Sequence, residues 1–169
     1  MNRPAAASRI DAFSIVTGQA VAWLTLVMVL STVVVVVLRY VFGTGQVWLQ
    51  ESVTWMHGAV FMLGAAYTLQ RDEHVRVDIF YRGLGPKGRG VVDCLGVLLF
   101  LLPTCAFLFM ASWEYVAATW TIHEVSRDAG GLPYPFVPLL KSILLLMPVA
   151  VSLQGISILL VAIRRIRGS

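Results

Sequence analysis

Charged side chains are scarce in this sequence. They make up 13% of its 169 residues, whereas 58% of the residues are hydrophobic. A soluble domain of this length needs many polar residues to cover its surface, so the composition indicates a membrane protein. The formal net charge is +4, but the basic residues lie at the ends of apolar runs. That placement favours orientation in a lipid bilayer over nucleic-acid binding, and we expect no nucleic-acid partner.

The residues that disulfide, zinc and haem sites require are also few. The only two cysteines, Cys94 and Cys105, lie in one apolar segment. Eleven residues of helix would separate them by about 16 Å, and a disulfide needs Cα atoms within about 7 Å. The three histidines, His57, His74 and His123, do not lie at matched depths on different apolar runs. We therefore expect no disulfide between these cysteines, no metal and no cofactor.

Catalytic patterns are missing as well. The sequence has no recognisable nucleophile–base pair and no Gly-rich phosphate loop. The apolar run Phe13–Leu38 contains no acidic residue, whereas a small multidrug transporter would need a carboxylate in the middle of its first span. These absences predict that the chain is not an enzyme, and they favour an accessory or scaffold role.

What the sequence does contain is four long apolar runs. They cover Phe13–Leu38, Val47–Leu69, Val91–Trp113 and Phe136–Ile163, and each exceeds the roughly 20 residues that cross a bilayer. The first includes Val33–Val37, which would favour a strand in water. In lipid every backbone polar group must be satisfied within its own segment, so we expect a helix there too. The predicted fold is a single all-α membrane domain over residues 1–169 with four transmembrane helices.

Basic residues predict the orientation of these spans. Four spans place the N-terminus, the segment Gln70–Gly90 and the C-terminus on one side of the membrane. Ten of the 13 Lys and Arg residues fall on that side: Arg3, Arg9, Arg71, Arg76, Arg82, Lys87, Arg89, Arg164, Arg165 and Arg167. Only Arg39, Arg127 and Lys141 fall on the other. Because basic residues collect in cytoplasmic loops, we expect both termini in the cytoplasm.

The segment Gln70–Gly90, QRDEHVRVDIFYRGLGPKGRG, is the most highly charged part of the chain. Asp78 is placed to cap a short interfacial helix over Ile79–Leu84, whose apolar residues would lie on the membrane surface. A plain solvated loop is the alternative. We interpret His74 as a hydrogen-bonding residue that organises this loop.

Span two carries an acidic residue near its outer end. Glu51 lies one turn into Val47–Leu69, close to Trp48, which belongs to a predicted aromatic belt at the outer membrane boundary. Charges within a span are costly and are functional candidates by default. Glu51 is open to three interpretations: an ion pair with Arg39, a contact to another subunit, or a role in ion coupling.

A stripe of polar and small residues runs along the same span. Its members recur at helical spacing and share one face: Gln50, Thr54, His57, Gly64 and Thr68. Such a stripe in lipid is typical of a helix–helix contact, either within this chain's own bundle or with a partner.

These features together resemble a known family. In order along the chain they are Arg39, WLQE at Trp48–Glu51, LGAAYTL at Leu63–Leu69, EHVRVD at Glu73–Asp78, and a Pro-rich entry to the last span. This ordered set in a four-span chain resembles the small membrane subunit of tripartite ATP-independent periplasmic (TRAP) transporters, the DctQ-type family.

The resemblance implies a role in secondary uptake of an organic acid across the bacterial inner membrane. In that family a separate extracytoplasmic substrate-binding protein captures the substrate and a large membrane subunit moves it, while the small subunit acts as a scaffold. The implied candidates are Arg39, Trp48, Glu51 and Gly64 for bundle or large-subunit contacts. His74 and Asp78 would organise the cytoplasmic loop. The alternative is a stand-alone four-span membrane protein that binds or senses a ligand.

Overall fold

A computed structural model of the protein describes residues 4–71, 81 and 83–168, and this part of the chain is helical, without strands. The elements are α1 (Ala5–Tyr40), α2 (Val47–Gln70), α4 (Pro86–Leu95), the π-helical segment η1 (Gly96–Leu101), α5 (Leu102–Thr121) and α6 (Phe136–Arg167). The all-α class predicted from the sequence is therefore confirmed for the described residues.

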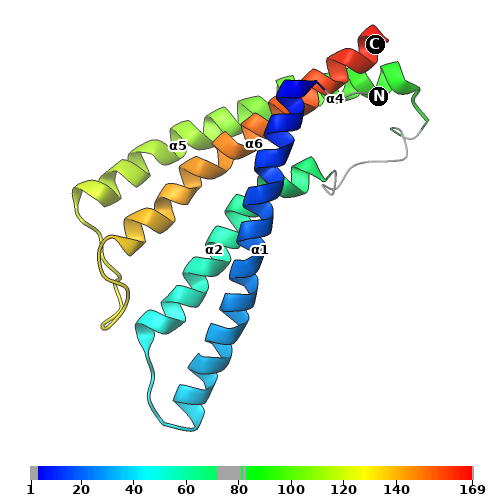
Figure 1. Ribbon diagram of the computed structural model, residues 1–169. Helices are drawn as coiled ribbons and strands as arrows, with labels where there is room; N and C mark the ends of the chain where they lie inside the picture. The colour runs from blue at the N-terminus through cyan, green and yellow to red at the C-terminus, as the bar shows by residue number, and fades with distance from the viewer. Residues whose placement is uncertain (1–3, 72–80, 82, 169) are drawn as a thin grey trace.

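The helices form two antiparallel pairs (Figure 1). α1 packs against α2, and the continuous stretch α4–η1–α5 packs against α6, while α1 and α2 both also contact α6. The start of α1, the helix α4 and the end of α6 gather at one end of the molecule. The connections 41–46 and 122–135 lie at the opposite end, so each pair is a long hairpin closed at that end.

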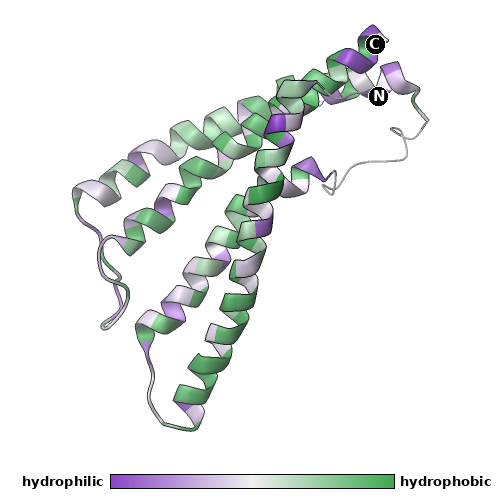
Figure 2. Cartoon of the chain, viewed as in Figure 1, coloured by the Kyte–Doolittle hydropathy of each residue, from purple (hydrophilic) through white to green (hydrophobic). Residues whose placement is uncertain are grey.

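Three helical stretches are long and apolar enough to cross a membrane by length and composition: Ala5–Tyr40, Pro86–Thr121 and Phe136–Arg167. Their most apolar windows have mean hydropathies of 2.7, 2.4 and 2.3. α2, over Val47–Gln70, is also a long helix but is not among these three. Figure 2 shows apolar residues along most of the helices, with hydrophilic residues at intervals within them and in the connections.

The valine-rich part of α1 shows how the membrane environment determines local structure. Val33–Val37 is helical although β-branched residues favour strands in water. A helix satisfies its backbone hydrogen bonds internally. This is required in lipid, because lipid tails offer the backbone no hydrogen-bond partners. Large apolar side chains point outward, among them Phe61 at 72% and Met110 at 74% exposure. Exposure of this kind fits a surface that lipid covers.

Small residues allow the helices to approach closely. A Cβ atom at Gly18 of α1 would overlap the Tyr67 side chain of α2. One at Gly155 of α6 would lie 2.7 Å from Leu101 Cδ2, and one at Gly90 of α4 would lie 2.9 Å from a backbone oxygen of α6. Helix association in lipid depends on such close contacts because the hydrophobic effect does not drive it there.

The C-terminal end of the charged segment Gln70–Gly90 is helical, so the connection before the next apolar helix is shorter than predicted. α4 begins at Pro86 rather than near Val91, so residues from Pro86 to Gly90 are helical. Proline is favourable at the first helical position because its missing N–H would be unpaired there anyway. Of the predicted interfacial helix, Ile79–Leu84, residues 79, 80 and 82 lie outside the described residues. Tyr81 is helical, whereas Gly83 and Leu84 are not, so the helix does not reach the predicted end.

Two prolines occur within the apolar stretches. Pro103 lies in the first turn of α5, directly after η1. Proline lacks the N–H that an α-helix would offer to the preceding turn, and a π-helical turn is one way to shift the hydrogen-bond pattern around it. α6 continues through Pro148, which is buried.

Candidate subunit interface

One face of α2 combines polar chemistry with exposure. Gln50, Thr54 and His57 are exposed, and Phe61 continues the same face with 72% exposure. These residues recur every three or four positions, as one helical face requires. Met56, Ala59, Ala66 and Leu69 are instead buried, in a helix that packs against α1 and α6. Between Gln50 and Phe61 the predicted polar stripe therefore points away from the other helices of this chain.

Gly64 extends this face toward the inner half of α2. A Cβ atom added to Gly64 would meet no heavy atom within 4 Å. One turn further, Thr68 is half-buried and its hydroxyl donates to the Ala65 carbonyl at 2.9 Å. The space beside Gly64 is thus open, and another backbone can approach there closely.

Exposed polar side chains are unfavourable on a helix that lies in lipid. Polar residues within the bilayer usually face protein or water, and small residues mark positions of close helix contact. We call the surface formed by Gln50, Thr54, His57, Phe61 and Gly64 the α2 polar face. It has the chemistry of a helix–helix interface, and the described part of the chain does not cover it.

Glu51 anchors residues 122–135, the connection between α5 and α6. Its carboxylate accepts a hydrogen bond from the Ser126 hydroxyl and another from the Leu132 backbone N–H at 2.6 Å. The backbone N–H of Trp48 donates to the Gly130 carbonyl at 3.1 Å, one turn earlier on α2. The start of α2 is therefore fastened to residues 126–132.

This arrangement differs from the ion pair with Arg39, which is one of the three interpretations of Glu51 that the sequence leaves open. Arg39 is exposed in the last turn of α1, and the partners that the structure gives Glu51 are Ser126 and Leu132. A loop that folds back over the start of α2 supplies a hydroxyl and a backbone N–H, and these satisfy the carboxylate without a cation. The sequence could not reveal this because Ser126 lies 75 residues from Glu51.

The surface beside Glu51 is hollowed. One recess of about 410 Å³ is lined by Val47, Gln50, Glu51, Thr54, Asp128 and Ala129. A second, of about 350 Å³, shares Glu51, Thr54 and Asp128 and extends to Leu132 and α6. The N-terminal end of the α2 polar face therefore opens into a concave, partly acidic surface.

Further contacts hold α5 and α6 together near the connection 122–135. Lys141 of α6 pairs with Glu124 at 2.6 Å, and its ammonium lies 4.4 Å from the centre of the Tyr115 ring. The indole N–H of Trp120 donates to the Ser142 hydroxyl at 3.0 Å, which joins α5 to α6. The end of the bundle that carries residues 122–135 is thus a connected structure.

Two of the remaining residues singled out from the sequence, Trp48 and His57, lie on α2. Trp48 is half-exposed at the start of α2, where its indole N–H donates to Gln46 at 3.2 Å. His57 is exposed on the α2 polar face. His74 and Asp78 lie outside the described residues.

A buried polar cluster that the sequence analysis missed joins α1 to α6. The Asp11 carboxylate accepts hydrogen bonds from the Gln154 amide at 2.9 Å and the Ser157 hydroxyl at 2.7 Å. Ser14 donates to the Gln154 carbonyl oxygen at 2.8 Å. All four side chains are at most 5% exposed. The signal was the regular spacing of Ala7, Asp11, Ser14 and Gly18, which places small and polar residues on one face of α1.

A second network lies at the end of the molecule where the termini gather. The Tyr81 hydroxyl lies 3.0 Å from both carboxylate oxygens of Asp93 on α4. Arg165 of α6 donates to the same carboxylate at 3.1 Å, and the Arg89 guanidinium lies 5.6 Å from the centre of the Tyr81 ring. Asp93 therefore connects the charged segment to the last turn of α6.

Among the described residues no group of three or more His, Cys, Asp or Glu side chains is arranged to hold a metal ion. No curated protein and no solved structure matches the chain. Residues 28–168 match the family of tripartite ATP-independent periplasmic transporters, DctQ component. The match covers α2, α4, η1, α5 and α6 completely and α1 from Met28 to its end. The chain therefore belongs to the DctQ family, the small membrane component of TRAP transporters.

Proposed function

We propose that this chain is a scaffold subunit of a TRAP-type secondary transporter that takes up an organic acid, and that the α2 polar face binds the large membrane subunit. The proposal also includes four transmembrane spans with both termini in the cytoplasm. The system would contain a separate extracytoplasmic substrate-binding protein, in keeping with the words tripartite and periplasmic in the family description.

The observation that carries this proposal is the exposure of Gln50, Thr54 and His57 on a long helix of a membrane protein. The interfaces within this chain already bury their polar groups, as Asp11 and Gln154 do between α1 and α6. The α2 polar face, in contrast, is left uncovered by the described residues. A partner helix can supply hydrogen-bond partners for these side chains.

Gly64 adds a steric argument for the same face. Since nothing lies within 4 Å of its missing Cβ, the glycine is not required by packing inside this chain. Glycine costs up to about 1 kcal/mol relative to alanine in a helix interior. An approaching backbone from a second protein gives a reason for its presence.

The orientation is supported by the fold. The start of α1 and the end of α6 lie at the same end of the molecule, and the last turn of α6 contains Arg164, Arg165 and Arg167. Positive residues collected at one end favour the cytoplasmic side for that end. Single cysteines placed at Ala5 and Gly168 should react with a membrane-impermeant maleimide only after the cells are opened, and a cysteine at Gly130 should react in intact spheroplasts.

The binding face can be tested by co-purification with a tagged large subunit. Gly64→Phe places a large ring on the α2 polar face and is expected to reduce recovery of the complex at least about tenfold. Gly96→Phe is the matched control, because a Cβ at Gly96 also meets no heavy atom within 4 Å but lies on η1. The control should assemble like the wild type.

Three results would contradict the proposal. The first is equal assembly of the Gly64→Phe and wild-type chains. The second is equal loss of assembly with Gly96→Phe. The third is substrate transport by this chain alone in liposomes, which would favour a stand-alone membrane protein. The organic acid itself is tested by uptake in vesicles that hold both membrane subunits and the binding protein, with organic acids offered singly.

A further inference from the structure

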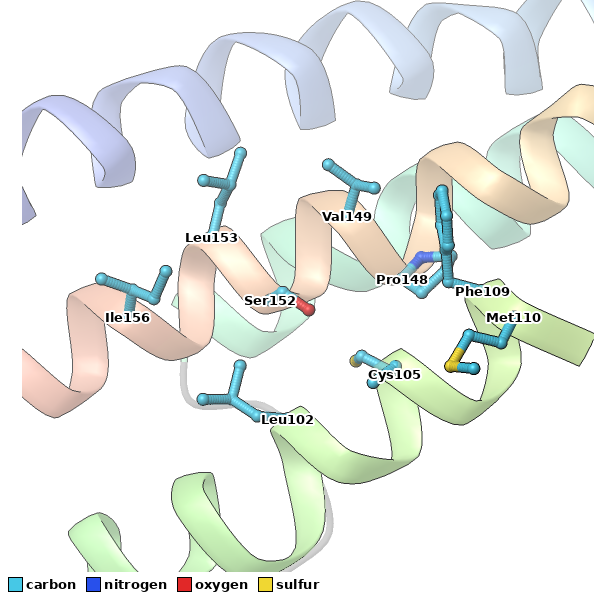
Figure 3. A pocket seen from close by; sticks show the side chains of 10 residues that line it. Leu102, Cys105, Phe109, Met110, Pro148, Val149, Ser152, Leu153 and Ile156 are labelled. Carbon is cyan, nitrogen blue, oxygen red and sulfur yellow. The ribbon is translucent and has the colours of Figure 1, made fainter. Parts of the chain in front are cut away.

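The hollows on the surface of this molecule differ in the occupant that they need. The groove of about 510 Å³ between α5 and α6 (Figure 3) is lined mostly by apolar side chains, so lipid tails can fill it. The two recesses at the start of α2 are different, because both are lined by Glu51 and Asp128. Among the described residues no Lys or Arg lines either recess. Two carboxylates therefore share this concave surface without a cation in its wall.

The Glu51 carboxylate is held in place but still has room for another donor. The Ser126 hydroxyl donates to one of its oxygens, and the Leu132 backbone N–H donates to the other at 2.6 Å. An ionised carboxylate accepts about four hydrogen bonds, so two of these are unused within the described part of the chain. The side chain is half-buried, where a hydrogen bond to a charged group is stronger than in water. Glu51 is thus a fixed acceptor in the wall of both recesses.

The other polar side chains of the recesses are open to a partner. Gln50, Thr54 and Asp128 make no side-chain hydrogen bond to any residue that the structure describes. Asp128 is exposed and is fixed through its backbone, whose N–H donates to the Ser126 hydroxyl at 3.1 Å. Its carboxylate is therefore positioned by the loop while remaining available.

We propose that these recesses receive a Lys or Arg side chain of the large membrane subunit. Charge complementarity identifies the chemistry, because two carboxylates at a concave surface match an ammonium or guanidinium group. Position identifies the partner, because Gln50 and Thr54 belong both to the recess and to the α2 polar face. The inference rests on the proposal that this face binds the large subunit, and it adds the kind of residue that the partner supplies.

Variants of Asp128 test this inference, because they change the charge of the recesses while both hydrogen bonds of Glu51 remain. Recovery of the complex with a tagged large subunit is measured at low and at high salt. Asp128→Asn keeps the shape of the side chain and should reduce recovery about threefold at low salt. Asp128→Lys should reduce it at least about tenfold, because like charges then meet. High salt should lower recovery of the wild type more than that of Asp128→Asn, because salt screens the ion pair.

Glu114→Gln is the matched control. Glu114 is also exposed, but it lies on α5 and lines neither recess. This variant should assemble like the wild type at both salt concentrations. Equal losses in Glu114→Gln and Asp128→Asn would reduce the effect to general surface charge and overturn the proposal.

The Gly64→Phe chain separates this inference from the proposed function. If Gly64→Phe loses assembly while Asp128→Lys assembles like the wild type, the α2 polar face remains the interface and the basic side chain is rejected. If both variants assemble like the wild type, both proposals fail.

A photo-cross-linking residue in place of Ala129, which lines one recess, identifies the partner segment directly. In the assembled complex it should attach to the large subunit within about one helical turn of a Lys or Arg. Attachment to a segment of the large subunit without Lys or Arg, or to the substrate-binding protein instead, would overturn the proposal.

Discussion

The Gln154 amide donates a hydrogen bond to the Asp11 carboxylate at 2.9 Å, across 143 residues of sequence. Through this contact the start of α1 is aligned with the middle of α6. Both groups are nearly inaccessible, at 5% exposure for Asp11 and 2% for Gln154. A sliding or rotation of either helix would leave buried polar groups without partners, which is costly in lipid and in protein interiors alike.

The first prediction concerns this contact. Gln154→Leu keeps the side-chain bulk but removes both polar atoms, so Asp11 loses one donor and Ser14 loses its acceptor. We expect a loss of about 1–3 kcal/mol in folding stability, measured by thermal unfolding of the purified chain in detergent. Thr17→Ala is the control, because the Thr17 hydroxyl bonds only to carbonyls of its own helix. Equal stability of Gln154→Leu and the wild type would contradict the structural role of the cluster.

The second prediction separates inward from outward glycines. Gly18→Leu forces a side chain into the Tyr67 ring and should destabilise the isolated chain by about 1–3 kcal/mol. Gly64→Leu should leave the isolated chain as stable as the wild type, since its Cβ meets open space. Both variants are compared by thermal unfolding in the same detergent. A Tyr67→Ala change should partly rescue Gly18→Leu, and its failure to do so would place the clash elsewhere.

The third prediction concerns the outer connection. Glu51→Ala removes the acceptor of the Leu132 backbone N–H, so this amide should exchange its hydrogen at least about fivefold faster. Glu51→Gln keeps one carbonyl oxygen and should show a smaller effect. Arg39→Ala should leave the exchange of Leu132 unchanged, because Glu51 is held by the loop. Faster exchange of the Leu132 amide in the Arg39→Ala chain would instead indicate that Arg39 helps to hold Glu51, as an ion pair would.

The sequence was informative where the physics is local. Long apolar runs predicted the helices over Val33–Val37 and Val47–Leu69, because backbone satisfaction in lipid leaves one solution. Helical spacing also predicted that Gln50, Thr54 and His57 share a face. The partner of Glu51 and the pairing of Asp11 with Gln154 were beyond reach. Both depend on which distant segments meet, and a single sequence carries no distance information between residues 75 or 143 positions apart.

The fourth prediction concerns the end where the termini gather. Asp93→Asn removes the charge that Arg165 contacts but preserves an oxygen for the Tyr81 hydroxyl. We expect a loss of roughly 1–2 kcal/mol in stability and faster hydrogen exchange at Arg89, whose N–H bonds to Gly85. Arg165→Lys keeps a positive charge beside Asp93. The stability of this variant should therefore lie between that of Asp93→Asn and that of the wild type. An Asp93→Asn chain with wild-type exchange at Arg89 would show that this network does not hold the start of α4.

The polar face of α2 also bears on how the chain enters the membrane. α1 contains a window with a mean hydropathy of 2.7, whereas α2 is not among the helices that are long and apolar enough, by length and composition, to cross a membrane. On the proposed topology, transfer of α2 by itself into the bilayer is therefore only weakly favourable. Transfer is more favourable when α2 is already packed against α1, because Tyr67 then lies against Gly18 and the buried side of α2 is covered. The hairpin α1–α2, rather than the single helix, is then the unit of insertion, and an unassembled subunit carries an uncovered polar surface in lipid. Such a surface gives the cell's membrane quality control a feature by which to recognise copies without a partner.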